Sequence, residues 1–154
     1  MDMMGRTHLV IALFFGLLFI GSMGNLQNKI IFSIVVLIAA VLPDIDSANS
    51  KIGHYKVLRF LQVFVRHRGM MHSFTVCIII SVLLAIFAPL LAFPFFLGYG
   101  LHLLADSMTL EGIQPFWPSS RTVNGWMQTG RHAEKVVFFV FIGLSVFALF
   151  VKFF

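Results

Sequence analysis

Five apolar runs divide this 154-residue chain, and they restrict it to folds that place most of its length inside a lipid bilayer. More than half of the residues are apolar, so a soluble domain of this size could not bury the apolar surface. Runs of this kind are typical of membrane helices. We therefore expect an all-α fold, a polytopic membrane bundle of about five transmembrane helices in a single domain, 1–154. The runs are 8–23, 29–42, 73–91, 95–108 and 136–154.

The segments between these runs carry turn and interface signals. Pro43 ends the second run, because the residue before a proline is disfavoured in the α conformation. In residues 57–66 apolar and basic side chains alternate, a pattern that favours a short amphipathic helix lying in the membrane interface. Pro89 and Pro94 predict a turn between the third and fourth runs, and residues 109–131 form a second polar segment.

Several features exclude other classes of protein. The first run follows Arg6 and resembles a signal-peptide core, but residues 21–24 are a poor cleavage site, so we expect the segment to be retained. Cys77 is the single cysteine, which excludes an intramolecular disulfide and any metal site built from several cysteines. The Lys and Arg residues are spread over the loops and form no separate tail, so membrane topology explains them better than nucleic-acid binding does.

An alternating path through the membrane would bring the polar residues together. With five crossings, the first, third and fifth runs begin on the side where the second and fourth runs end. Every histidine and nearly every carboxylate then lies on one membrane face. That face also carries most of the basic residues, which predicts that it is cytoplasmic. The basic residues there are Arg6, Lys51, Lys56, Arg59, Arg66, Arg68, Arg121, Arg131 and Lys135, against Lys29 and Lys152 on the other face.

The strongest chemical signal is the pair His102 and Asp106 at the end of the fourth run. On a helix these residues are i and i+4, so their Cβ atoms lie about 5–6 Å apart on one face. An imidazole nitrogen and a carboxylate oxygen each bind zinc at about 2.0–2.2 Å, so one ion fits between them. Such residues at the rim of a membrane are costly unless they have partners. The pair therefore predicts a metal site.

The other predicted ligands come from three segments. Asp44 and Asp46 follow the second run, where the chain turns away from it. His67 and His72 are five residues apart and do not share a helical face, so we expect a loop ligand and a helix-start ligand. With His8 there are enough groups for one or two divalent ions, zinc first, with manganese or iron as alternatives.

Each of these residues also has a simpler explanation. His8 could be a cap or an interfacial residue, and the aspartate pair could cap the amphipathic segment. His132 and Glu134 could form a helix-start cap without joining the site. Trp117 and Trp126 fit interfacial anchors better than substrate contacts. The joint occurrence of the acids and imidazoles at one end is what favours a metal site.

Four motifs resemble those of one membrane-protein family. They are Thr7-His8, Leu42-Pro43-Asp44-Ile45-Asp46, His67-Arg68-Gly69-Met70-Met71-His72-Ser73, and His102-Leu103-Leu104-Ala105-Asp106-Ser107-Met108-Thr109 with Gly112 and Phe116-Trp117-Pro118. In this combination the chain resembles the YdjM-like family of bacterial inner-membrane proteins, described as metal-dependent hydrolases with some members under LexA (DNA-damage) control. The resemblance implies that the functional set is His8, Asp44, His67, His72, His102 and Asp106.

The order of these residues is also similar to that of zinc-dependent phospholipase C and related nucleases. Those enzymes add a later His-x-x-x-Glu motif, and the spacing of His132 and Glu134 departs from it. The comparison therefore argues against a third metal site in this chain.

We therefore expect a metal-dependent hydrolase that cleaves a phosphoester of a lipid or lipid-linked substrate at the cytoplasmic face. Arg68 or Arg121 would hold phosphate oxygens, which suit guanidinium geometry. One of Asp44 and Asp46 would bind the metal, and the other would support it or act as a general base. The expected partners are membrane lipids and a phosphate-containing substrate, without nucleic acid. The alternatives are a metal-ion transporter or channel and a non-catalytic lipid-binding adaptor.

Overall fold

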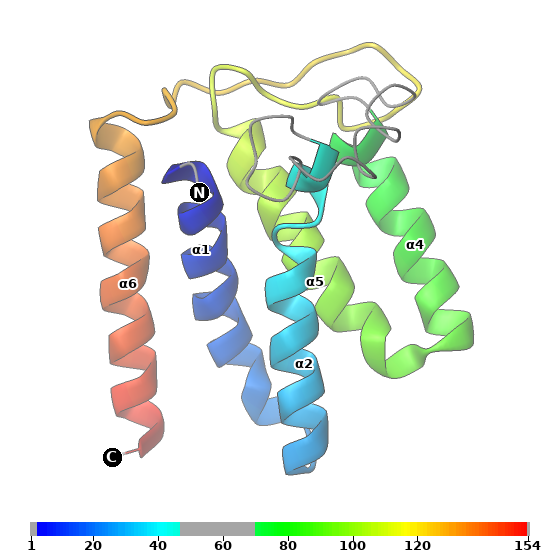
Figure 1. Cartoon of the computed structure of the whole chain (residues 1–154), viewed down its shortest axis with the longest axis vertical. Coiled ribbons are helices and arrows are strands. Elements are labelled where there is room, and N and C mark those ends of the chain that lie inside the picture. Colours follow the sequence, from blue (N-terminus) through cyan, green and yellow to red (C-terminus); the bar gives the residue numbers. More distant parts are fainter. Residues whose placement is uncertain (1–2, 47–69, 154) are drawn as a thin grey trace.

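A computed structural model describes residues 3–46 and 70–153 of the chain, and within these ranges it is a bundle of five α-helices with no named strand (Figure 1). The prediction of an all-α bundle is confirmed. The segment 57–66, expected as an amphipathic helix, lies outside the described residues. The helices are α1 (Met3–Phe19), α2 (Leu26–Ala39), α4 (Phe74–Phe87), α5 (Pro89–Ser107) and α6 (His132–Phe153), with short 3₁₀ turns η1 (Ile20–Ser22), η2 (Pro43–Asp46) and η3 (Met70–His72).

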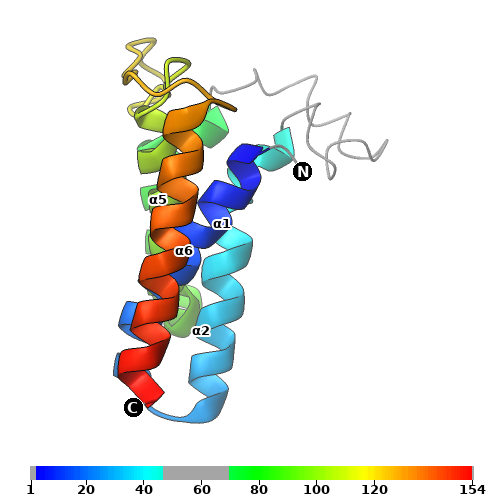
Figure 2. The same cartoon turned by 90° about the vertical axis from the view of Figure 1, so that its left-hand side faces the viewer.

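The helices alternate in direction, as the five apolar runs predicted. Helices α1, α4 and α6 begin at the end of the bundle where α2 and α5 finish, which is the upper end in Figure 1. The loop from α5 to α6 crosses the same end, as the view turned by 90° also shows (Figure 2). We call this the polar end of the bundle. It gathers segments that are far apart in the sequence.

Three of the helices are long and apolar enough to cross a membrane: 5–22, 89–107 and 132–152. Helices α2 and α4 are apolar but have 14 residues each, which gives a length of about 21 Å. Their complete crossing of a bilayer stays a prediction. The apolar side chains of α6 are largely exposed, including Phe139 and Phe147, as expected for a helix that faces lipid.

Several of the expected helix boundaries were wrong by three to six residues: α2 ends at Ala39 and not at 42, α4 ends at Phe87 and not at 91, and α6 begins at His132 and not at 136. Helix α1 begins at Met3, so His8 lies inside the helix and not at its start. We expected a turn at Pro89 and Pro94, but Ala88 alone separates α4 from α5. Helix α5 begins at Pro89 and continues through Pro94. A proline at the first helical position removes an N–H that would have no helical partner. Pro94 removes only one hydrogen bond near the start of a long helix.

Helix α5 is the centre of the bundle and packs against α1, α2 and α4. Its closest approach to α2 is at Gly98, where an added Cβ would lie 2.2 Å from the carbonyl oxygen of Val36. Only glycine allows two helix backbones to come so near. Tyr99 and Leu103 follow on the buried side of α5 and form its core with Cys77 of α4. This packing fixes the axis of the helix that carries His102 and Asp106.

The segment between α5 and α6 is an extended loop and contains no helix. A parallel bridge joins Thr109 to Met127, and an antiparallel bridge joins Ile113 to Val123. Ile113 is buried in the core of the bundle. The Phe74 N–H donates to the Pro115 carbonyl at 2.9 Å, which ties the loop to the start of α4. The loop therefore has a defined path across the polar end.

The close approach at Gly98 gives a test of the packing. We expect Gly98→Ala to lower the free energy of unfolding by about 1–3 kcal/mol, because the added methyl group meets a backbone atom that cannot move aside. The matched control is Gly100→Ala in the same helix, where an added Cβ meets nothing within 4 Å. Unfolding in mixed micelles with added SDS measures both. Equal stability of the two variants would contradict the packing described.

Candidate metal centre

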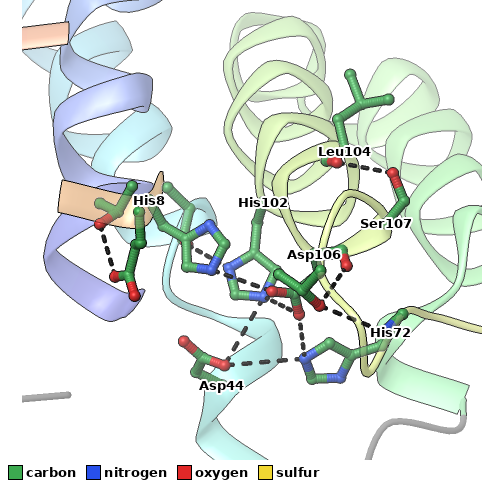
Figure 3. A network of polar contacts seen from close by, with 12 residues as sticks. His8, Asp44, His72, His102, Leu104, Asp106 and Ser107 are labelled. Carbon is green, nitrogen blue, oxygen red and sulfur yellow. Dashed lines mark hydrogen bonds and ion pairs between the residues drawn. The ribbon is translucent and has the colours of Figure 1, made fainter. Parts of the chain in front are cut away.

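Five ionisable side chains from four separate elements converge at the polar end (Figure 3). His8 comes from α1, Asp44 from η2, His72 from η3, and His102 and Asp106 from the last turns of α5. All but Asp44 are buried. Figure 3 shows their polar atoms facing a common centre. We call these five residues the His–Asp cluster.

Two imidazole nitrogens of the cluster lie between the carboxylates of both aspartates. Nε2 of His72 and Nε2 of His102 lie 3.4 and 3.5 Å from Oδ2 of Asp106. Each of these nitrogens is also 3.8 Å from Oδ1 of Asp44. Ligands at about 2.0–2.2 Å from a tetrahedral zinc ion are roughly 3.3–3.6 Å from one another. The distances from His72 and His102 to Asp106 fall in this range, so the spacing of these three residues suits one ion, and Asp44 lies slightly farther from both nitrogens.

His8 lies against the second oxygen of the same aspartate. Its Nε2 is 3.3 Å from Oδ1 of Asp106, and its ring stacks on that of His102 with a centroid distance of 4.0 Å. Ligand atoms that could hold a metal form two groups, one of His8, Asp44 and His102 and one of His72, His102 and Asp106. Because His102 belongs to both groups, they are parts of one site, whose content of one or two ions stays a prediction.

The contacts within the cluster are too long for hydrogen bonds, which favour about 2.7–3.2 Å. Both ring nitrogens of His8, Nε2 of His102 and both oxygens of Asp106 are buried and make no hydrogen bond in the described part of the chain. Buried polar atoms without partners are rare and costly. A divalent cation would satisfy these atoms together, and imidazole with carboxylate is a suitable donor set for zinc, manganese or iron.

The orientation of His102 is fixed from outside the cluster. Its Nδ1 donates to the carbonyl oxygen of Ala40 at 2.8 Å. A carbonyl can only accept, so Nδ1 carries the proton and the lone pair of Nε2 faces the centre. This arrangement is the usual support of a metal-binding histidine. Ala40 directly follows α2, so the end of that helix orients a predicted ligand of α5.

The segment around His72 is held by two contacts. The Ser73 hydroxyl donates to the Met70 carbonyl at 2.7 Å and accepts from the Val76 N–H as the N-cap of α4. The Tyr99 hydroxyl donates to the Met71 carbonyl. Both contacts hold η3 in place, and with it His72. Because Tyr99 is three residues before His102, it lies on the same side of α5 as the cluster.

Asp106 is held where α5 ends. The Thr109 hydroxyl donates to the Asp106 carbonyl at 2.8 Å and accepts from the Gly112 N–H. Gly112 has a φ of +65°, a left-handed conformation that favours glycine. The chain can therefore leave the helix directly after its last ligand.

The cluster is open to its surroundings at Asp44. The side chain of Asp44 is 30% exposed, whereas the side chains of the other four residues are 2% exposed or less. Partial burial raises the pKa of Asp44, but its contact with His72 and its proximity to His102 and His8 outweigh burial and hold the pKa below its usual value. Asp44 is therefore a carboxylate at neutral pH, as a ligand must be.

Other predicted site residues lie outside the cluster or outside the described residues. Arg121 is exposed in the loop between α5 and α6, and in the described part of the chain no ion pair joins it to the cluster. His67, Arg68 and the side chain of Asp46 lie outside the described residues. Their predicted roles as a metal ligand, a phosphate clamp and a general base stay predictions.

His132 and Glu134 are not part of the cluster. His132 is exposed at the start of α6. Glu134 is buried, but it accepts hydrogen bonds from the Thr7 hydroxyl and the Gly130 N–H. The interpretation of Glu134 as a helix-start cap fits these contacts.

The family described as YdjM inner membrane protein matches residues 3–153 of the sequence, which is almost the whole chain. No curated protein and no solved structure matches it. The apolar helices agree with the membrane location that the family description names. With this match, the resemblance drawn from the sequence motifs is confirmed, and the chain belongs to the YdjM inner membrane protein family.

Proposed function

We propose that the protein is a membrane-embedded, metal-dependent hydrolase that cleaves a phosphoester of a lipid or lipid-linked substrate at the cytoplasmic face. The observation that carries this proposal is the His–Asp cluster, in which His8, His102 and Asp106 bury polar atoms that face one another at 3.3 to 3.5 Å and make no hydrogen bond in the described part of the chain. A divalent ion bound there, with zinc the first choice, would supply polarisation of a phosphoryl oxygen and activation of water.

The exposure of the cluster suggests where a substrate would approach. His8, His72, His102 and Asp106 are closed in by the helices, whereas Asp44 is partly open. A phosphate group would therefore enter beside Asp44 and leave the other four residues in place as ligands. Asp46 is the proposed general base, as the sequence analysis expected. Arg68 and Arg121 are the proposed clamps for phosphate oxygens.

The loop between α5 and α6 supports a lipid substrate. Phe116, Trp117 and Trp126 are exposed on this loop at the same end of the bundle as the cluster. Exposed basic side chains, Arg121 and Arg131, belong to the same segment. Aromatic rings and cations together suit the headgroup layer of a membrane. A lipid headgroup could reach Asp44 from this layer without leaving the membrane.

The orientation of the bundle follows from its charge. Among the described residues the basic side chains concentrate at the polar end, and short loops rich in Lys and Arg stay in the cytoplasm. We therefore propose that the cluster faces the cytoplasm. The residues are Arg6, Arg121, Arg131 and Lys135 at the polar end, against Lys29 and Lys152 at the other.

A hydrolase explains the position of the cluster better than a transporter does. Transport sites usually lie near the middle of the membrane at broken helices, whereas His102 and Asp106 lie in the last turns of α5. A lipid-binding adaptor would need the basic loops but would leave a buried carboxylate and its imidazoles without a role.

Metal content is the first test. We expect the protein purified in detergent to carry a stoichiometric transition metal, and the double variant His102→Ala/Asp106→Ala to lose it, because these residues supply ligand atoms to the centre. The matched control is His132→Ala, which removes an exposed imidazole at the same end and should leave the metal in place. Inductively coupled plasma mass spectrometry measures the content. A metal-free wild-type protein, also after incubation with zinc, manganese or iron, would refute the site.

Hydrolysis is the second test. Protein reconstituted in vesicles of phosphatidylglycerol and phosphatidylethanolamine should release phosphorus-containing products that ³¹P NMR detects, and a chelator should stop the release. Asp44→Asn should lower the rate by about 100-fold or more, since it weakens a ligand at the open side. Inert vesicles of both lipids, and of total bacterial lipid extract, would contradict a lipid phosphoester as substrate.

Tryptophan fluorescence tests the membrane position of the loop. Trp117 and Trp126 are the only tryptophans in the chain, so Trp117→Phe and Trp126→Phe each leave a single fluorophore. We expect lipids brominated near the headgroup to quench both fluorophores more strongly than lipids brominated near the chain end. Emission that no brominated lipid quenches would place the loop in water and remove the support for an interfacial substrate.

A further inference from the structure

Helix α6 supplies none of the five residues of the His–Asp cluster, yet its first turn contains a buried carboxylate. Glu134 is 1% exposed. Its Oε1 accepts from the hydroxyl of Thr7 at 2.9 Å, and its Oε2 accepts from the Gly130 N–H. The backbone conformation of Gly130 allows this second bond. Its φ of +77° lies in the left-handed region, which favours glycine.

This carboxylate links the first and the last helix next to the cluster. Thr7 and Glu134 are 127 residues apart in sequence, and Thr7 directly precedes His8. Helix α6 packs against α1, and most of its remaining surface is exposed and apolar. At the opposite end of this pair the Lys152 ammonium donates to the Leu17 carbonyl. Polar contacts therefore fix α6 to α1 at both ends, and the one at the polar end adjoins a predicted ligand.

The environment of His8 shows why such a contact matters. His102 is oriented by a hydrogen bond to the Ala40 carbonyl, but neither ring nitrogen of His8 makes a hydrogen bond in the described part of the chain. In the described part of the chain, the printed contacts of the His8 ring are its stacking on His102 and its approach to Asp106, so its place depends on the position of α1. A small rotation or shift of α1 would move its Nε2 away from Asp106, which lies 3.3 Å away.

We propose that Glu134, acting through Thr7, holds the first turns of α1 against α6 and so keeps His8 in register with Asp106. Glu134 is then a positioning residue and not a metal ligand. This inference rests on the proposed metal site, because His8 needs its position only if it binds an ion. A buried carboxylate that accepts two hydrogen bonds and faces a neighbouring helix suits this role, since each bond to a charged acceptor is strong and directional.

The first experiment needs no metal. Full-length protein in detergent, stripped of metal, is treated with diethyl pyrocarbonate, and mass spectrometry compares the modification of His8 with that of His102. We expect Glu134→Ala and Thr7→Val to raise the modification of His8 severalfold and leave His102 protected. Thr7→Ser keeps the hydroxyl and should behave as wild type. Unchanged modification of His8, or an equal rise at His8 and His102, would overturn the proposal.

The control for general destabilisation lies in the same helix. Ser145 is 4% exposed and donates to the Phe141 carbonyl, so Ser145→Ala removes a buried hydroxyl of α6 at a distance from the site in sequence. This variant should leave the modification of His8 unchanged. A rise as large as that in Glu134→Ala would mean that any loosening of α6 exposes His8, and would overturn a specific role of Glu134.

Zinc affinity separates this inference from the proposed function. We expect Thr7→Val and Glu134→Ala to weaken zinc binding about 10-fold, the usual effect of losing an outer-shell partner, and to have no further effect when His8 is already alanine. Equal losses with and without His8 would overturn the inference. Wild-type protein that binds zinc while both variants bind it equally well would also overturn it and leave the metal site standing, whereas wild-type protein that binds no zinc would refute the metal site itself.

Discussion

The carboxylate of Asp106 is the group on which the polar end of the bundle depends. It is buried, neither of its oxygens is hydrogen-bonded within residues 3–46 and 70–153, and imidazole nitrogens face both oxygens at 3.3 to 3.5 Å. A carboxylate in such a place is stable only when something with positive charge satisfies it. The three imidazoles around it lie too far for hydrogen bonds but at the spacing of ligands around one ion. The helices therefore hold an arrangement that makes physical sense with a cation at its centre.

Residues outside the cluster hold three of its members in position. The Ala40 carbonyl orients His102, Tyr99 and Ser73 hold the segment of His72, and Thr109 closes the helix after Asp106. Gly98 brings α2 close enough to α5 for the first of these contacts. Since the five residues of the cluster come from four separate elements, the cluster forms only when these elements are packed together. The binding of an ion would in turn favour the assembled bundle.

Much of this arrangement could be predicted from the sequence. The spacing of His102 and Asp106 and the alternation of apolar runs were enough to place His8, Asp44 and His72 at the same end, because helix direction follows from counting crossings. The hydrogen bond from His102 to the Ala40 carbonyl could not be predicted. Every residue has a carbonyl group, and only the packing of the helices determines which one lies next to His102. Pro89 and Pro94 led to the wrong prediction of a turn, because a proline in or near the first turns of a helix does not end that helix. The role of Tyr99 could have been predicted, because its spacing of three residues from His102 places both side chains on one face of the helix.

X-ray absorption at the zinc edge, on full-length protein loaded with zinc, identifies the atoms around the bound ion. We expect a first shell of nitrogen and oxygen at about 2.0–2.2 Å, with the outer-shell scattering that imidazole rings produce. That scattering should weaken, but not vanish, in His8→Ala, because His72 and His102 remain. A spectrum of zinc surrounded by oxygen alone, without any imidazole contribution, would contradict the claim that the three histidines and two aspartates of the polar end bind one metal centre.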